Sequence, residues 1–136
     1  MRNGMVVYEN SLITLAFAPE TDTLLATWTN TELYSSFEVK QTLEKLTDVL
    51  ITYNIKNLLI DARQGNVGMN DDDYRTIVIE FLNELGKTPL RKFARVITSD
   101  PLREEKIYTI RQKVVFPFEF EDFRTREEAY SWLASQ

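Results

Sequence analysis

The amino-acid sequence predicts an α/β fold, in which helices pack on a mixed sheet with N-terminal antiparallel strands and a parallel centre. Residues 5–10, 12–17 and 23–30 are short segments rich in β-branched and aromatic residues, which is typical of strands. The turns between them are too short for a parallel crossover, so we expect an antiparallel meander. Helical and strand-like segments then alternate, which gives the order β-β-β-α-β-α-β-α-β-α.

The first predicted helix follows residue 35. Its apolar residues recur at alternating steps of four and three, as expected for one face of a helix. Ser35 and Glu38 have the spacing of a capping box. The stripe consists of Val39, Leu43, Leu46, Leu50 and Tyr53.

A buried strand and a second helix come next. Residues 57–61 form a short apolar run that ends at Asp61. The helix is expected to start at Asn70 and to end near Gly86, which suits a C-terminal cap. Its apolar face consists of Tyr74, Ile77, Val78, Phe81, Leu82 and Leu85.

The C-terminal third contains two further strand–helix pairs. Residues 92–99 and 116–122 read as strands. Pro101 suits the first position of a helix, and Thr125 starts a second capping-box pattern. Three successive β-α-β units require parallel strands with right-handed crossovers, so we expect a sheet of five to seven strands.

Composition limits the chemistry that the chain can perform. Its 136 residues fit a single domain over residues 1–136. It has no cysteine and no histidine. These absences exclude disulfides, thiolate nucleophiles, Ser-His-Asp catalysis and ordinary zinc sites. We therefore predict a protein that is not an enzyme and that needs no cofactor.

Charge and hydropathy limit the partners. The net charge of -5 disfavours a general nucleic-acid surface, which would need a basic excess. No segment approaches the roughly 20 apolar residues that span a bilayer, and no apolar run of signal-peptide length is present at the N-terminus. We expect a cytoplasmic protein without a membrane span.

Three segments resemble the SpoIIAA-like group of the STAS superfamily, the sulphate transporter and anti-sigma factor antagonist domains. These segments are "LLATWTN", "SSFEVKQTLEKLTDVLITYNIKNLLIDAR" and "FPFEFEDFRTREEAYSWLAS". The similarity extends over nearly the whole chain. The resemblance implies a non-enzymatic regulatory or protein-binding module, and a homodimer as one form of it.

The same resemblance points to the loop after Asp61. In anti-sigma factor antagonists a Ser or Thr in the matching loop is phosphorylated, but residues 62–73 contain neither. A phosphorylation switch at this loop is therefore not expected. A protein-binding surface at the strand and helix ends remains as the leading hypothesis, and its candidate residues are Asp61, Asn66, Met69, Asn70 and Asp71.

Other chemistry at this loop is disfavoured. Gly65 and Gly68 are not followed by the Lys and Ser or Thr of a phosphate-binding loop. Asp61 with residues 71–73 offers carboxylates for a hard cation, but acids in a first helical turn are explained by the helix dipole. We therefore predict no metal site. We also expect the charged segment 102–106 to be a solvated helix face.

Aromatic residues support an alternative function. Core packing is the first interpretation of the aromatic tail, in which Phe116, Phe118 and Phe120 should share one face of a strand. The alternative is an apolar pocket or self-association surface. In that case the protein is a carrier or sensor of a small apolar or lipid-like ligand, and the candidate residues are Trp28, Phe37, Phe118 and Trp132.

Overall fold

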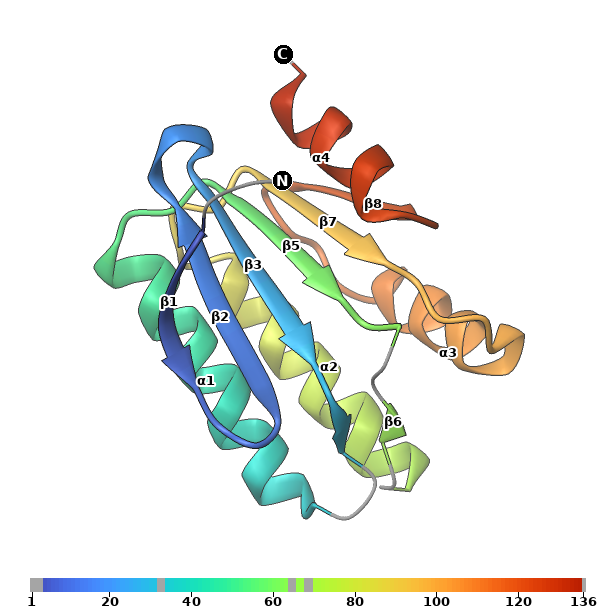
Figure 1. Cartoon of the computed structure of the whole chain (residues 1–136). Coiled ribbons are helices and arrows are strands. Elements are labelled where there is room, and N and C mark those ends of the chain that lie inside the picture. The colour runs from blue at the N-terminus through green and yellow to red at the C-terminus, as the bar shows by residue number, and fades with distance from the viewer. Residues whose placement is uncertain (1–3, 32–33, 64–65, 68–69, 136) are drawn as a thin grey trace.

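A six-stranded mixed sheet forms the centre of the computed structural model, which describes residues 4–31, 34–63, 66–67 and 70–135 (Figure 1). The strand order is β1-β2-β3-β5-β7-β8. β1 to β3 form an antiparallel meander, whereas β3, β5, β7 and β8 run parallel to one another. The sheet thus confirms the predicted fold class. Its strands are Met5–Glu9 (β1), Ile13–Ala18 (β2), Thr23–Trp28 (β3), Asn57–Asp61 (β5), Lys92–Val96 (β7) and Glu119–Phe123 (β8).

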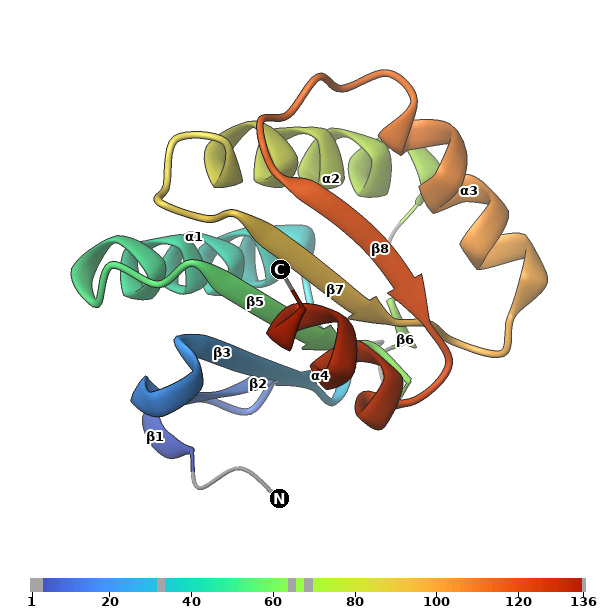
Figure 2. The same cartoon turned by 90° about the horizontal axis from the view of Figure 1, so that it is seen from above.

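Three helices cover one face of this sheet and the fourth lies on the other (Figure 2). Each parallel strand is added on the same side of the one before it, so crossovers of one hand place α1, α2 and α3 on one face. The helices are Ser36–Thr52 (α1), Asp71–Leu85 (α2), Pro101–Arg111 (α3) and Arg126–Ala134 (α4). A short 3-10 helix, Pro19–Thr21, joins β2 to β3, and β4 (Asn30–Thr31) pairs with β6 (Asn66–Val67).

The helix starts follow the local sequence signals. Ser35 forms both halves of the predicted capping box, because its Oγ accepts from the Glu38 amide at 3.2 Å and its own amide donates to the Glu38 carboxylate at 2.9 Å. Asn70, Asp100 and Thr125 cap α2, α3 and α4 in the same way, each accepting a backbone N–H. These caps determine the residue at which each helix begins.

Alternation along the strands divides the core into two layers. In β5, Leu58 and Ile60 face α1 and α2, whereas Leu59 faces α4. The larger layer lies under the three helices, and it includes Leu15, Leu24, Leu46, Leu50, Leu82 and Leu85. The smaller layer, under α4, consists of Leu59, Ala94, Val96, Ala129 and Leu133.

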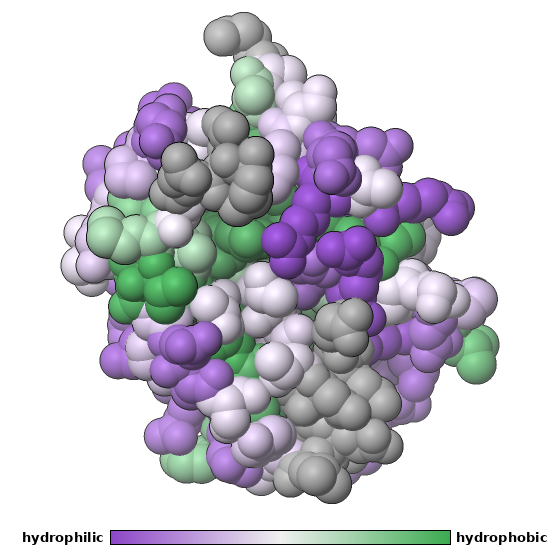
Figure 3. Space-filling view, viewed as in Figure 1, coloured by the Kyte–Doolittle hydropathy of each residue, from purple (hydrophilic) through white to green (hydrophobic). Residues whose placement is uncertain are grey.

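The α4 side of the sheet is only partly covered. α4 contacts β5, β7 and β8. None of the described helices covers the N-terminal strands on this side. Figure 3 shows apolar surface there, where β1 exposes Met5 and Val6. In the described part of the chain, no helix is long and apolar enough to cross a membrane.

The structure tests the predictions made for Gly86 and for the aromatic tail. Gly86 caps α2 as predicted, but its φ of -64° is helical. A side chain there would bring Cβ to 3.2 Å from the Pro117 ring, so close approach explains the glycine. The prediction that Phe116, Phe118 and Phe120 share one face of a strand is wrong, because β8 begins at Glu119 and includes only Phe120. All three rings nevertheless pack against the larger core layer.

Candidate functional site

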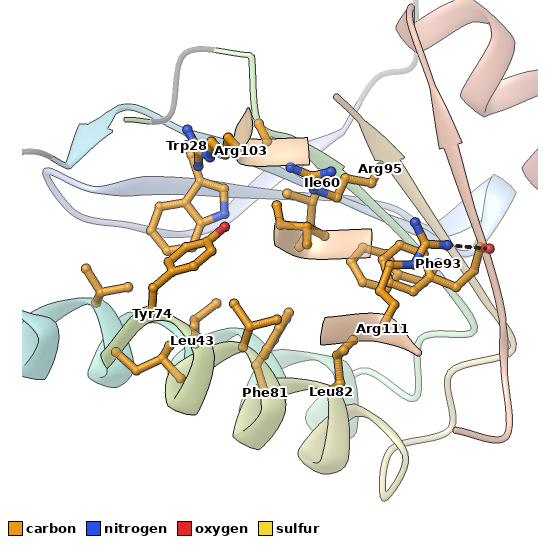
Figure 4. Close-up of a pocket in the computed structure, with 16 residues that line it drawn as sticks. Trp28, Leu43, Ile60, Tyr74, Phe81, Leu82, Phe93, Arg95, Arg103 and Arg111 are labelled. Atoms are coloured by element: carbon orange, nitrogen blue, oxygen red, sulfur yellow. Dashed lines mark hydrogen bonds between the residues drawn. The ribbon is translucent and has the colours of Figure 1, made fainter. Parts of the chain in front are cut away.

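A cavity of about 110 Å³ lies between the sheet and helices α1, α2 and α3 (Figure 4). Its floor is formed by β3, β5, β7 and β8, and its walls come from the three helices. α2 lies between α1 and α3 and contacts both helices. The cavity's lining residues from β3 and β5 lie at the carboxyl ends of these strands, where open α/β sheets bind their ligands, whereas Phe93 and Phe120 lie near the amino ends of β7 and β8.

The cavity has one apolar wall and one cationic wall. α1 and α2 contribute mostly aliphatic and aromatic side chains, among them Leu43 and Phe81. The opposite wall carries Arg95 from β7 and Arg103 and Arg111 from α3. Such a division fits a molecule with an apolar body and one polar end.

Arg95 belongs to a buried ion pair with Glu104. The Arg95 Nη2 lies 3.1 Å from Glu104 Oε2, and Thr98 donates to the same oxygen through its amide at 3.0 Å and its hydroxyl at 2.7 Å. Burial raises the pKa of Glu104, but the hydrogen bonds from Arg95 and Thr98 outweigh it and hold the pKa below its ordinary value. Glu104 is therefore a fixed carboxylate and a poor proton donor at neutral pH.

Arg111 is held equally firmly. Its guanidinium carbon lies 3.6 Å from the centre of the Phe120 ring, and its Nη1 lies 2.8 Å from an Asp122 carboxylate oxygen. Its Nη2 also donates to the Phe120 carbonyl at 3.0 Å, the bond drawn in Figure 4. Both Arg95 and Arg111 thus have a carboxylate partner.

Trp28 and Tyr74 bring unused hydrogen-bond donors to the cavity. Both side chains line it, together with Arg103 at the same end in Figure 4. Neither the Trp28 indole N–H nor the Tyr74 hydroxyl forms a hydrogen bond within the described part of the chain. This end of the cavity can therefore receive an acceptor oxygen.

The structure separates the four predicted apolar-ligand residues. Trp28 lines the cavity, whereas Phe118 is buried in the core beside Phe93, with ring centres 6.2 Å apart. Phe37 lies in the first turn of α1 with 65% of its surface exposed. Trp132 lies on the opposite face of the sheet, against Phe123. Of the four, only Trp28 is a cavity residue.

Asp61, the first predicted partner-binding residue, is buried in an ion-pair cluster on the α4 side. Arg63 Nη2 and Arg126 Nε each lie 2.7 Å from its Oδ2. Burial raises the pKa of Asp61, but the hydrogen bonds from the two arginines outweigh it and lower the pKa to about 2. The carboxylate thus ties the end of β5 to the start of α4.

Two of the other predicted partner-binding residues, Asn70 and Asp71, lie at the start of α2. Asn70 caps this helix, and Asp71 is exposed, with its Oδ1 2.8 Å from Lys106 Nζ on α3. The hydrogen bond from Lys106 lowers the pKa of Asp71. Asn66 belongs to β6, and Met69 lies outside the described residues. Asp61 and Asp71 therefore sit on opposite faces of the sheet.

Sequence reasoning missed the cationic wall. The segment 102–106 was expected to be a solvated helix face, and this prediction is wrong for Arg103, which lines the cavity, and for Glu104, which pairs with buried Arg95. The segment "KFARV" contains a signal that could have indicated this ion pair, because an arginine within a buried strand requires a partner. Tyr74 was predicted as part of the apolar face, and its hydroxyl was overlooked.

Comparison of the chain with protein-family models, with curated proteins and with solved structures found no match in any of the three. Among the described residues no group of three or more carboxylates, histidines or cysteines converges on a metal site. The candidate site is therefore defined by its own geometry, which is that of a cavity with an apolar body and a donor-rich end.

Proposed function

We propose that the protein is a non-enzymatic binding domain that carries or senses a small, mostly apolar molecule in the cavity under α1, α2 and α3. The observation that carries this proposal is the cavity itself, with its apolar wall and unused donors at one end. Asp61 and Glu104 are the two most buried carboxylates among the described residues. Both are held ionised by arginines, which disfavours acid–base chemistry.

The size of the cavity sets the size of the enclosed group. An engineered, dry cavity of about 150 Å³ in another protein holds benzene. The volume of about 110 Å³ here is smaller and therefore encloses about four non-hydrogen atoms. A longer chain would extend beyond the cavity.

A chain-length series of primary alcohols tests this proposal. Fluorescence of a Trp132→Phe variant, in which Trp28 is the remaining tryptophan, reports on the cavity. From propanol to octanol the affinity should rise about fourfold per added methylene and then level off once the cavity is full. An affinity that does not depend on chain length would contradict the proposal.

A cavity-filling variant provides the matched control. Val78→Phe places a larger side chain in the cavity and should abolish the binding of the longer alcohols. Val115→Phe makes the same exchange at a position that is 98% exposed, and it should leave the affinities unchanged. Equal affinities in the two variants would show that the alcohols bind elsewhere.

The second candidate is the regulatory, protein-binding module that the STAS resemblance implies. The observation that favours it is the exposed start of α2, where Asn70 and Asp71 follow the loop that is phosphorylated in anti-sigma factor antagonists. Native mass spectrometry of the protein from its own cells separates the two candidates. An added mass of a few hundred daltons supports the binding of a small molecule, whereas a complex with another chain supports the module.

A further inference from the structure

The polar end of the cavity is made of donors. The Trp28 indole can only donate, and the Tyr74 hydroxyl has no acceptor in the described part of the chain. Neither polar atom is among the described side-chain N and O atoms that are fully buried without a partner, so both remain accessible to a ligand. Both side chains line the same cavity, so one ligand group with acceptor oxygens would satisfy them together.

Arg103 adds positive charge at this end. It lines the cavity near Trp28 and Tyr74 in Figure 4. A guanidinium carries five N–H donors, so Arg103 can keep its contacts within the protein and also donate to a ligand. Hydrogen bonds from an arginine to an ionised acceptor are about twice as strong as those between neutral groups.

The other two arginines that line the cavity are held within the protein. Arg95 pairs with Glu104 and Arg111 with Asp122. Beyond the donor end, the cavity is bounded by apolar side chains such as Phe81 and Phe93. A ligand that fits the whole cavity has one negative end and an uncharged apolar body.

We propose that the ligand is a small monocarboxylate, whose carboxylate accepts hydrogen bonds from Trp28, Tyr74 and Arg103 and whose hydrocarbon part lies against α1 and α2. This inference rests on the proposed function and names the ligand class for the same cavity. It also gives Trp28, Tyr74 and Arg103 a role in binding, which an entirely apolar ligand would not.

The test compares hexanoate, hexanamide and hexylamine at pH 7 by fluorescence of the Trp132→Phe protein. The three share a hydrocarbon chain and differ in the charge of the head group. Hexanoate should bind at least about tenfold more tightly than its neutral isostere hexanamide, and hexylamine should bind most weakly. Equal affinities for hexanoate and hexanamide would overturn the inference.

Substitutions of Tyr74 and Arg103 test whether the preference for hexanoate arises at the donor end of the cavity. Tyr74→Phe removes a hydroxyl without a partner in the described chain and should weaken hexanoate binding about tenfold. Arg103→Gln should remove most of the preference for hexanoate over hexanamide, and Arg103→Lys should restore part of it. Arg124→Gln makes the same charge change at an exposed position and should leave the preference intact.

The outcomes keep the two proposals apart. If hexanol binds but hexanoate binds no better than hexanamide, the carboxylate inference fails and the proposed function stands. If neither alcohols nor carboxylates bind, both fail. Circular dichroism of each variant confirms that it is folded, and a folded Arg103→Gln protein with an unchanged preference would also overturn the inference.

Discussion

Two arginine–carboxylate clusters lie one strand apart on opposite faces of the sheet. At the end of β5, Asp61 points toward α4 and accepts from Arg63 and Arg126. On the neighbouring strand β7, Arg95 points toward α3 and pairs with Glu104. The acid comes from the sheet in the first cluster, and the arginine comes from the sheet in the second.

The two clusters differ in how much water reaches them. The side chain of Asp61 is 4% exposed, but those of Arg63 and Arg126 are 46% and 32% exposed. The side chains of Arg95 and Glu104 are 6% and 17% exposed. The first cluster therefore tethers α4 at the surface, whereas the second places both charges inside the wall of the cavity. Removing an acid should cost more in the second, because its arginine cannot reach water.

Glu104→Gln should have the largest effect. It leaves buried Arg95 without a counter-charge, and we expect a loss of about 3–5 kcal/mol in the free energy of unfolding. The double variant Arg95→Met, Glu104→Gln should cost less than the single one, because no buried charge remains. Urea unfolding measures both. Glu105→Gln, at an exposed position on the same helix, should change little. A double variant less stable than Glu104→Gln would contradict this account of the buried pair.

Asp61→Asn should have a smaller effect that depends on pH. The folded pKa of about 2 lies below the ordinary value of 3.8, so folding favours the ionised form. Its contribution, about 2 kcal/mol, is complete above pH 4 and is lost as the pH falls through 2. At pH 7 the variant should be less stable by about that amount, and its stability should vary less than that of the wild type between pH 4 and 2.

The control for Asp61→Asn is Asp72→Asn, because Asp72 is exposed and pairs with Arg75 at the surface. This variant should keep the wild-type profile between pH 4 and 2. If Asp61→Asn also kept that profile, the cluster would not be the source of the pH dependence.

Asp71→Asn should have the smallest effect of the three. The ion pair with Lys106 joins α2 to α3 at the surface, where solvent and salt screen it. We expect a shift in the urea midpoint smaller than that of either buried cluster, and no shift in 1 M NaCl. A shift that persists in high salt would show that the pair does more than join two exposed helices.

The fold could be predicted because its signals are local. The change from strand-like to helical spacing at Ser35, the cap residues Asn70 and Thr125, and Pro101 each act within a few residues. Strand direction then followed from connection length. Tyr53 shows the limit of periodicity, because it continues the helical stripe but is the exposed C-cap of α1.

The site was predicted less well because it depends on contacts between distant residues. Periodicity places Trp28 and Trp132 in apolar surroundings, but it does not show that they lie on opposite faces of the sheet. Nor does it show that Arg95 meets Glu104. A charged segment such as 102–106 is on average exposed to solvent. Glu104 is an exception, because its partner Arg95 on β7 is buried.

The two tryptophans provide the most direct test of the central claim, that the α1–α3 side of the sheet binds a carboxylate and the α4 side does not. Each contributes one indole N–H signal to a ¹H–¹⁵N NMR spectrum, so one titration with hexanoate compares both faces. We expect the Trp28 signal to move and saturate while the Trp132 signal stays in place. Movement of Trp132 alone, or of neither signal, would contradict it.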